Sequence, residues 1–244
     1  MSKRLKFFLS HLSISAMIAL LVISIIFFVW YPSPLAQAVG VTHIFLMLLT
    51  IDVIIGPILG FIVYKEGKKT LKMDLTVIIL LQIAALGFGI YSIEQGRPAW
   101  LVYNVDRFEL VRKNELVDTN IQQAQPQFQK PSWFKPQYVA TEFAKDTQQR
   151  NDEMFAEAFG GISIAQKPER YVPLDKVKNQ IQKRALPLKE LEQYNPKTDV
   201  EKTLAKYPKA DAWLPLKANA VDMVILMNKE KAKVIRIVDL RPWN

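Results

Sequence analysis

The sequence contains no cysteine, and this absence excludes several kinds of chemistry. Disulfide bridges, thiolate metal sites and cysteine nucleophiles all need a thiol, and the 244 residues offer none. Histidine is scarce as well, with two residues, both before residue 94. The sequence has no Gly-rich phosphate loop and no paired metal-ligand spacing. It therefore predicts no cofactor, no metal site and no catalytic residue.

Charge is missing from one long stretch and common elsewhere. Residues 7–51 contain no Lys, Arg, Asp or Glu. Residues 1–93 hold 10 charged side chains and residues 94–244 hold 45, although the whole chain averages 23%. The first part is too apolar for a soluble domain, whereas the second has ordinary globular composition. We therefore expect a transmembrane region over residues 1–93 and a water-exposed domain over residues 94–244.

The uncharged stretch is too long for one membrane-spanning helix. Its 45 residues would form a helix of about 67 Å, roughly twice the hydrocarbon thickness of a bilayer. Pro32 and Pro34 interrupt it, and proline disfavours helical geometry at the residue that precedes it. The sequence predicts three transmembrane α-helices, at about residues 12–30, 40–64 and 75–93.

Positive charges indicate the orientation of these spans. The segment Lys3-Arg4-Leu5-Lys6 precedes the first span, and four lysines within residues 65–72 separate the second and third, whereas the first loop has none. Basic loops stay in the cytoplasm. We therefore expect a cytoplasmic N-terminus and, after three crossings, a domain outside the cytoplasm that begins at about Glu94, in the periplasm if the cell is Gram-negative. We expect membrane lipid around the spans.

The alternative to a membrane anchor is a cleaved signal peptide. Residues 3–6 would make its basic region, and Ala36-Gln37-Ala38 fits the small-residue cleavage pattern. However, the apolar stretch between them is about 19 residues, longer than a usual signal core. Its prolines also lie directly against a second span. These features favour the anchor.

Four residues distinguish the second span: Asp52, Gly56, Pro57 and Gly60. A charge at mid-membrane costs roughly 2.5–3.5 kcal/mol, whereas each Leu, Ile, Val or Phe contributes about 0.3–0.6 kcal/mol to insertion, so the span still inserts. The aspartate should face protein or water, Pro57 should kink the helix, and the glycines allow close approach of another helix. Either these residues pack against the other spans, with Asp52 protonated or bonded to a serine, or they receive a helix of another protein.

The two histidines, His11 and His43, fall near predicted span ends. A proton relay with Asp52 is one interpretation. Polar side chains at the membrane interface are commoner, so we expect interfacial positions for both.

Residues 94–244 are enough for one hydrophobic core and are predicted to form an α+β domain. Residues 100–111 are rich in aromatic and β-branched residues, which predicts strand with a turn near Asp106-Arg107. Residues 221–227 and 234–240 predict a terminal β-hairpin, and their apolar runs predict central strands buried on both faces. The domain's charges are spread along the chain, which argues against nucleic-acid binding.

Two segments within this layout resemble a known family. They are Asp52–Gly60 (DVIIGPILG) and Gly96–Val111 (GRPAWLVYNVDRFELV). Together with the three spans and the terminal hairpin, they resemble the type IV pilin accessory proteins of the TfpX/TfpZ kind. The resemblance implies a chaperone-like inner-membrane protein that is associated with the major type IV pilin and aids its stability or its entry into the pilus. Such families are tied to twitching motility and natural transformation.

A pilin waits in the membrane as a long apolar helix with a globular head outside, so two groups of contacts are expected. The expected contacts with the pilin helix are Asp52, Gly56, Pro57 and Gly60. The expected contacts outside the membrane are Trp100, Tyr103, Asp106 and Arg107. The alternative for the second group is an ordinary strand, with the aromatic side chains as interfacial anchors and Asp106–Arg107 as a local ion pair.

Two other functions stay open. A membrane-bound enzyme that modifies pilin or envelope glycans would need two carboxylates in one cleft, and the acidic residues show no such pattern. We therefore do not expect an enzyme. A structural subunit of the pilus assembly machinery would instead bind assembly proteins even when pilin is absent.

Overall fold

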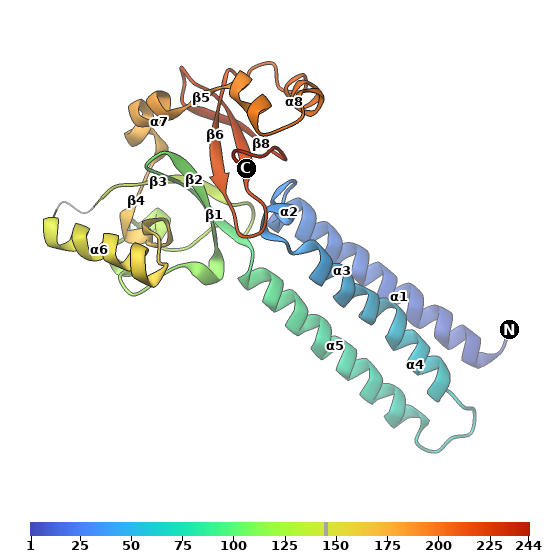
Figure 1. Ribbon diagram of the computed structural model, residues 1–244. Helices are drawn as coiled ribbons and strands as arrows, with labels where there is room; N and C mark the ends of the chain where they lie inside the picture. The colour runs from blue at the N-terminus through green and yellow to red at the C-terminus, as the bar shows by residue number, and fades with distance from the viewer. Residues whose placement is uncertain (144–145) are drawn as a thin grey trace. The chain divides into compact units, whose positions relative to one another are not determined.

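The computed structural model describes residues 1–143 and 146–244, with the backbone alone for residues 43, 44, 48, 149, 153, 154, 156 and 158. The chain divides into two compact units (Figure 1). Met1–Pro32 and Val41–Gly96 form the first, which we name the membrane unit. Ser33–Gly40 and Arg97–Asn244 form the second, which we name the head.

Three helical segments of the membrane unit are long and apolar enough to cross a membrane: Lys3–Trp30, Phe45–Val63 and Leu71–Gln95. They run side by side, as Figure 1 shows for α1, α4 and α5. The helices are α1 (Lys3–Ile25), α3 (Thr42–Thr50), α4 (Gly56–Val63) and α5 (Leu71–Gln95), with π-helical turns at Ile26–Trp30 and Ile51–Ile55. The expectation of three apolar helices is confirmed.

In the second of these segments the distribution of side chains is the reverse of that in a water-soluble helix. Between residues 51 and 62 its isoleucines and Leu59 are exposed, as they would be to lipid. The buried positions carry small or polar residues. These buried residues are Asp52, Gly56, Pro57 and Gly60. The spacing of four residues between Asp52, Gly56 and Gly60 places them on one helix face, and that face points into the bundle.

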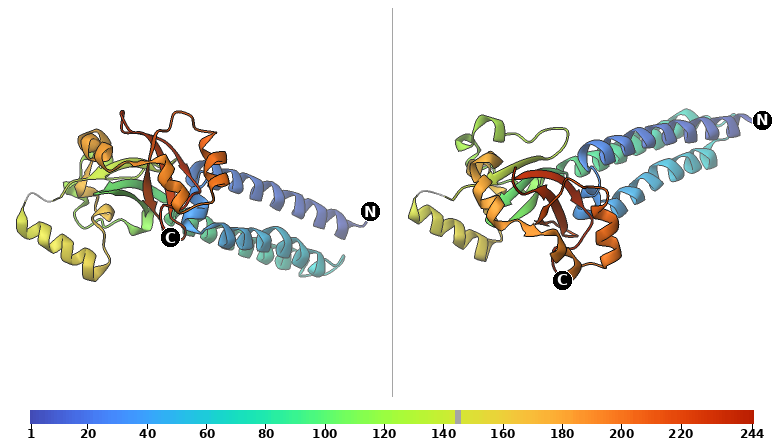
Figure 2. Two further views of the ribbon diagram at one scale, coloured as in Figure 1. Left: turned by 45° about the horizontal axis from the view of Figure 1, so that its top comes forward. Right: turned by 90° about the horizontal axis from the view of Figure 1, so that it is seen from above.

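The head is an α+β domain built on one mixed eight-stranded sheet (Figure 2). Its strands are β1 (Pro98–Asn104), β2 (Arg107–Arg112), β3 (Gln137–Thr141), β4 (Tyr171–Val172), β5 (Leu186–Pro187), β6 (Ala212–Lys217), β7 (Met223–Asn228) and β8 (Lys233–Val238). Its helices are α2 (Leu35–Val39), α6 (Thr147–Gly160), α7 (Lys178–Arg184) and α8 (Lys197–Leu204). The strand order is β4-β3-β1-β2-β6-β7-β8, and β5 also pairs with β6. The pairs β1–β3 and β2–β6 are parallel, and the expected α+β class is confirmed.

Side chains alternate between the two faces of the sheet, as the pleat requires. On β1, Leu101 and Tyr103 enter a large core cluster that extends across β2, β6 and β7. Trp100 and Val102 point to the opposite face and enter a smaller cluster around Phe128. Strand β1 is therefore buried on both faces, because a different cluster covers each.

The terminal hairpin forms as expected, with β7 antiparallel to β8. Five of the six residues of β7 are fully buried and alternate between two clusters. Strand β8 is the last strand of the sheet and is partly exposed. The expectation of central strands is therefore confirmed for the first strand of the hairpin and wrong for the second, because nothing pairs with the outer edge of β8 among the described residues.

The loop between the first two apolar helices belongs to the head. Leu35 and Ala38 of α2 are buried in the large core cluster, and the Ala38 carbonyl accepts hydrogen bonds from the backbone N–H groups of Ala220 and Val221 at 2.9 and 3.2 Å. Gly40 ends this helix with φ +79°, and a Cβ there would lie 2.9 Å from the Ala220 side chain. Only glycine fits both the backbone conformation and the space. A segment of the apolar run is thus part of the core of the head.

Candidate functional site

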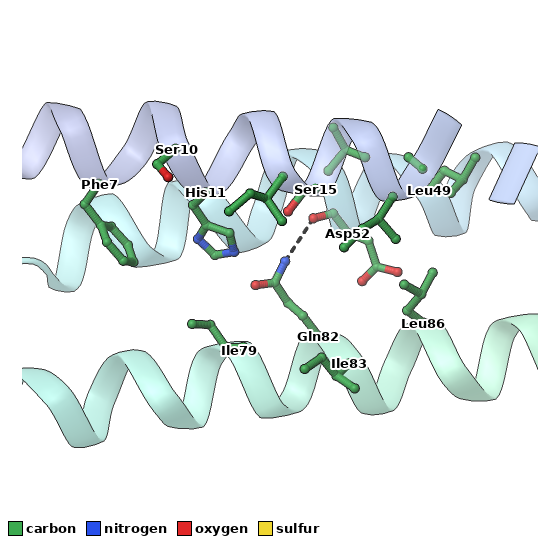
Figure 3. A pocket seen from close by; sticks show the side chains of 14 residues that line it. Phe7, Ser10, His11, Ser15, Leu49, Asp52, Ile79, Gln82, Ile83 and Leu86 are labelled. Atoms are coloured by element: carbon green, nitrogen blue, oxygen red, sulfur yellow. Dashed lines mark hydrogen bonds between the residues drawn. The ribbon is translucent and has the colours of Figure 1, made fainter. Parts of the chain in front are cut away.

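A cleft of about 360 Å³ opens within the membrane unit. Residues of α1, of the second apolar segment and of α5 line it, and its walls are mostly apolar (Figure 3). Polar side chains interrupt these walls: two hydroxyls, Ser10 and Ser15, together with His11, Asp52 and Gln82. Asp52 was expected to face protein or water, whereas no sequence pattern pointed to Gln82.

The backbone around Asp52 explains why Gln82 lies there. Asp52 belongs to a π-helical turn that ends just before Pro57. Proline has no N–H, so carbonyls in the preceding turn lose a donor. The Gln82 side chain donates a hydrogen bond to the backbone carbonyl of Asp52 at 3.0 Å, as Figure 3 shows. A side chain of a neighbouring helix thus replaces the missing backbone donor. The kink expected at Pro57 stays a prediction, and what the backbone shows beside it is the π-helical turn Ile51–Ile55.

The two glycines of the second span are covered from within the same chain. A Cβ at Gly56 would lie 1.7–2.6 Å from the amide atoms of Gln82. A Cβ at Gly60 would lie 3.0 Å from the Phe7 ring and 3.3 Å from His11. The glycines therefore allow α5 and α1 to pack closely on the second span. This arrangement corresponds to the interpretation in which these residues pack against the other spans.

Several polar atoms that line the cleft have no hydrogen-bond partner among the described residues. These atoms are Oδ2 of Asp52, Oε1 of Gln82 and Nδ1 of His11, all buried. Asp52 as a whole is 8% exposed. His11 lines the cleft, and its interfacial position stays a prediction, while the side chain of His43 lies outside the described residues.

Outside the membrane unit, two of the four expected contact residues are buried. Trp100 and Tyr103 are each 1% exposed. The Trp100 ring packs against Phe128 and Tyr171 at centroid distances of 5.9 and 5.4 Å. Burial raises the pKa of Tyr103 to about 12. Both side chains stabilise the core of the head, so neither is available at its surface.

The other two residues, Asp106 and Arg107, lie at the surface where β1 turns into β2. Arg107 donates two hydrogen bonds to the Asp106 carboxylate, at 2.8 and 3.2 Å, and these bonds hold the pKa of Asp106 below its ordinary value. Both residues line a polar cleft of about 340 Å³, together with Glu109, Glu157 and Lys217. The structure thus contains the local ion pair that was the alternative interpretation, and it places that pair in a charged cleft.

The turn itself has a strained backbone. Val105, between the paired residues Asn104 and Arg107, has φ +57°. This region disfavours β-branched residues. The Val105 carbonyl accepts hydrogen bonds from Tyr103 and Gln180 at 3.0 and 2.8 Å, and these bonds hold the conformation. Strained residues of this kind concentrate at functional sites.

No group of three or more potential metal ligands occurs among the described residues. The cleft in the membrane unit is apolar with buried polar atoms, and the cleft in the head carries charges of both signs.

Comparison with known proteins gives matches of one kind. The family described as Fimbrial assembly protein FimB matches residues 1–40. The fimbrial assembly protein of serogroup I from Dichelobacter nodosus is 30% identical over 229 residues, which cover 90% of this chain and 88% of that protein. The protein of serogroup E1 from the same organism is 29% identical with the same coverage. A protein of serogroups C1 and C2 is 33% identical over 116 residues, 47% of this chain and 88% of that protein. No solved structure matches.

Proposed function

The chain belongs to the family of fimbrial assembly proteins, and on this premise we propose that it binds the major type IV pilin and supports its stability or its entry into the pilus. The observation that carries the proposal is the 30% identity to a fimbrial assembly protein over 88% of that protein's length. The family assigns the chain to fimbrial biogenesis, and the relatives' names indicate an assembly role rather than catalysis. Binding of the major pilin is the more specific part of the proposal, which goes beyond what the family assigns.

We place the protein in the bacterial inner membrane, with its N-terminus in the cytoplasm and its head in the periplasm. The head combines Ser33–Gly40 with Arg97–Asn244, so both segments need the same side of the membrane. Two apolar helices separate them, and two crossings return a chain to the side it left. The basic residues before the first span and between the last two favour a cytoplasmic N-terminus. The burial of Leu35 and Ala38 also supports an anchor, because cleavage after Ala38 would remove part of the core.

The two units correspond to the two parts of a pilin, an apolar membrane helix and an external head. We propose that the pilin helix lies along the open side of the cleft in the membrane unit, where Asp52 supplies a polar contact. Gly56, Pro57 and Gly60 act indirectly, since they shape this cleft from inside. The pilin head then contacts the surface turn at Asp106 and Arg107, while Trp100 and Tyr103 hold that turn in place from the core.

Photo-crosslinking in cells that express the pilin tests this assignment. A photoreactive residue at Ile83, which lines the membrane cleft, and another at Val105, on the head, should each capture the pilin. The matched control for Ile83 is Leu81, which is similarly exposed (66% against 62%) but does not line the cleft. Failure of both Ile83 and Val105 to capture pilin would rule out direct binding. Recovery of assembly proteins from cells without pilin would favour a structural subunit of the machinery.

The head contact has a separate test in piliation. Arg107→Glu breaks the ion pair with Asp106 and reverses one charge in the cleft, and we expect fewer pili and weaker twitching motility and natural transformation. Lys209→Glu, a charge reversal at an exposed position outside this cleft, is the control. Normal piliation by a stably expressed Arg107→Glu protein would show that the Asp106–Arg107 ion pair has a structural role only.

A further inference from the structure

The cleft in the membrane unit combines an apolar lining with a carboxylate that has no counter-charge. Asp52 is 8% exposed, and its Oδ2 has no hydrogen-bond partner among the described residues. In Figure 3 this carboxylate points into the space between the second apolar segment and α5, near Leu86. A buried carboxylate without a partner is unfavourable in a protein interior and in hydrocarbon alike.

The chain places no lysine or arginine near Asp52, and His11 is the basic side chain that shares the cleft. No Lys or Arg occurs in residues 7–64 or 73–96. Asp52 is the eighth residue of the 19-residue segment Phe45–Val63, which places it about 10 Å along that helix. Lipid ammonium groups lie in the headgroup layer outside the hydrocarbon core, so they do not reach it. A second polar oxygen, Oε1 of Gln82, also has no hydrogen-bond partner within the described part of the chain, which adds to the shortage of donors.

We propose that the cleft receives a transmembrane helix of a partner protein that carries one basic side chain at mid-membrane depth, and that this side chain donates hydrogen bonds to the carboxylate of Asp52. A helix is the suitable carrier because it satisfies its own backbone within the membrane. A long lysine or arginine side chain can enter a cleft of about 360 Å³ while the helix itself stays at the open side. The inference rests on the proposed function for the idea that the protein holds a membrane helix, and it adds the chemistry of the contact.

The test uses the full-length protein in lipid nanodiscs and synthetic transmembrane peptides as probes. Each peptide is a Leu/Ala helix of about 20 residues, enough to span the bilayer, with Lys, Leu or Glu at its centre. Binding is measured by energy transfer between labelled peptide and labelled protein. We expect the Lys peptide to bind about tenfold more tightly than the Leu peptide, as an intramembrane polar contact of ordinary strength would produce, and the Glu peptide to bind no better than Leu.

Three variants locate the effect. Asp52→Asn should reduce binding of the Lys peptide to the level of the Leu peptide, and Asp52→Glu should retain the preference. Asp74→Asn is the matched control, because Asp74 also lies on a membrane helix but is paired with Lys68 and Thr70. It should change nothing. Equal binding of the Lys and Leu peptides to the unmodified protein, or full binding by Asp52→Asn, would overturn the inference.

A second measurement does not depend on any change at Asp52. A photoreactive residue at Ile83 should crosslink the Lys peptide, and one at Leu81 should not. Equal crosslinking at both positions would contradict binding in the cleft. Lys-peptide binding without capture of pilin in cells would sustain this inference and refute the proposed function. Pilin capture without a preference for the Lys peptide would sustain the proposed function and refute this inference.

Discussion

The membrane unit and the head differ in which residues they bury: large apolar side chains are buried in the head and exposed in the second span of the membrane unit. Among the described residues of the head, large apolar side chains fill hydrophobic clusters, and strand β7 is buried on both faces. In the second span of the membrane unit, isoleucines such as Ile58 and Ile62 are exposed, while Asp52, Gly56 and Gly60 are buried. Lipid is as apolar as a core, so helices in a membrane associate through close contact of small residues and through polar groups. Loss of volume should therefore harm the head, and gain of volume should harm the membrane unit.

The largest expected effect concerns a residue that lies between apolar helices in sequence but in the head in space. Leu35→Ala should destabilise the head by about 2–5 kcal/mol, because it leaves a cavity in the large core cluster. The measurement is thermal unfolding of the detergent-solubilised protein, followed by the fluorescence of the buried tryptophans Trp100 and Trp213. Gln37→Ala, an exposed neighbour on the same short helix, should leave the transition unchanged. Equal effects of the two substitutions would show that this loop is not part of the core of the head.

The next effect tests the membrane unit in the opposite sense, by adding volume. Gly56→Ala should displace the Gln82 side chain and break its hydrogen bond to the Asp52 carbonyl, at a cost of about 1–3 kcal/mol for the group left unpaired. Gly87→Ala on α5 is the control, since a Cβ there meets nothing within 4 Å. Because the chain has no cysteine, thiol labelling of Leu49→Cys can report opening of the bundle. We expect faster labelling with Gly56→Ala than with Gly87→Ala, and equal or slower labelling with Gly56→Ala would contradict the packing.

A smaller effect is expected at the strained turn of the head. Val105→Gly should raise stability by about 1 kcal/mol, because glycine adopts positive φ without the strain of a β-branched residue. Thermal unfolding measures the gain. If the turn also contacts pilin, the stabilised variant should still form fewer pili. A loss of stability in Val105→Gly would show that relief of the strain does not outweigh the backbone entropy that glycine loses on folding.

The smallest expected effect is on the pH dependence of stability, through the carboxyl group of Glu115. Burial alone would raise the pKa of the Glu115 carboxyl, but hydrogen bonds from the Arg112 side chain and backbone and from Asn219 outweigh it and hold that pKa below its ordinary value of 4.5. A depressed pKa contributes stability at higher pH, and this contribution is lost as the pH falls below 4.5 and through the lower folded-state pKa. Glu115→Gln should therefore make unfolding less pH-dependent below about pH 4.5. An identical pH profile for both proteins would show that these bonds do not favour the charged form.

Patterns within short stretches of sequence predicted much of this fold. The apolar helices, the turn at Asp106-Arg107 and the terminal hairpin each depend on neighbouring residues, so composition and periodicity suffice to find them. Asp52 was also identifiable, because a lone carboxylate in an apolar span is unusual.

Other features depended on segments far apart in the chain. Trp100 and Tyr103 looked like surface anchors, but clusters on both faces of β1 bury them. For Gly56 and Gly60 the sequence left two interpretations, packing within the chain or contact with another protein, and in the structure Gln82 of one helix and Phe7 of another cover them. Gln82 itself carried no signal, since a glutamine is noticeable only when its partner is known.

The sequence alone determined that this chain has an apolar, three-helix part and a polar α+β part, because hydropathy and strand alternation add up residue by residue along the chain. The tertiary structure decided which side of each residue meets protein. It placed Leu35 in the core of the head, turned Trp100 inward and put Asp52 on a cleft where its Oδ2 has no hydrogen-bond partner among the described residues. These outcomes depend on pairings between distant segments, whose energies exist only once the chain has folded.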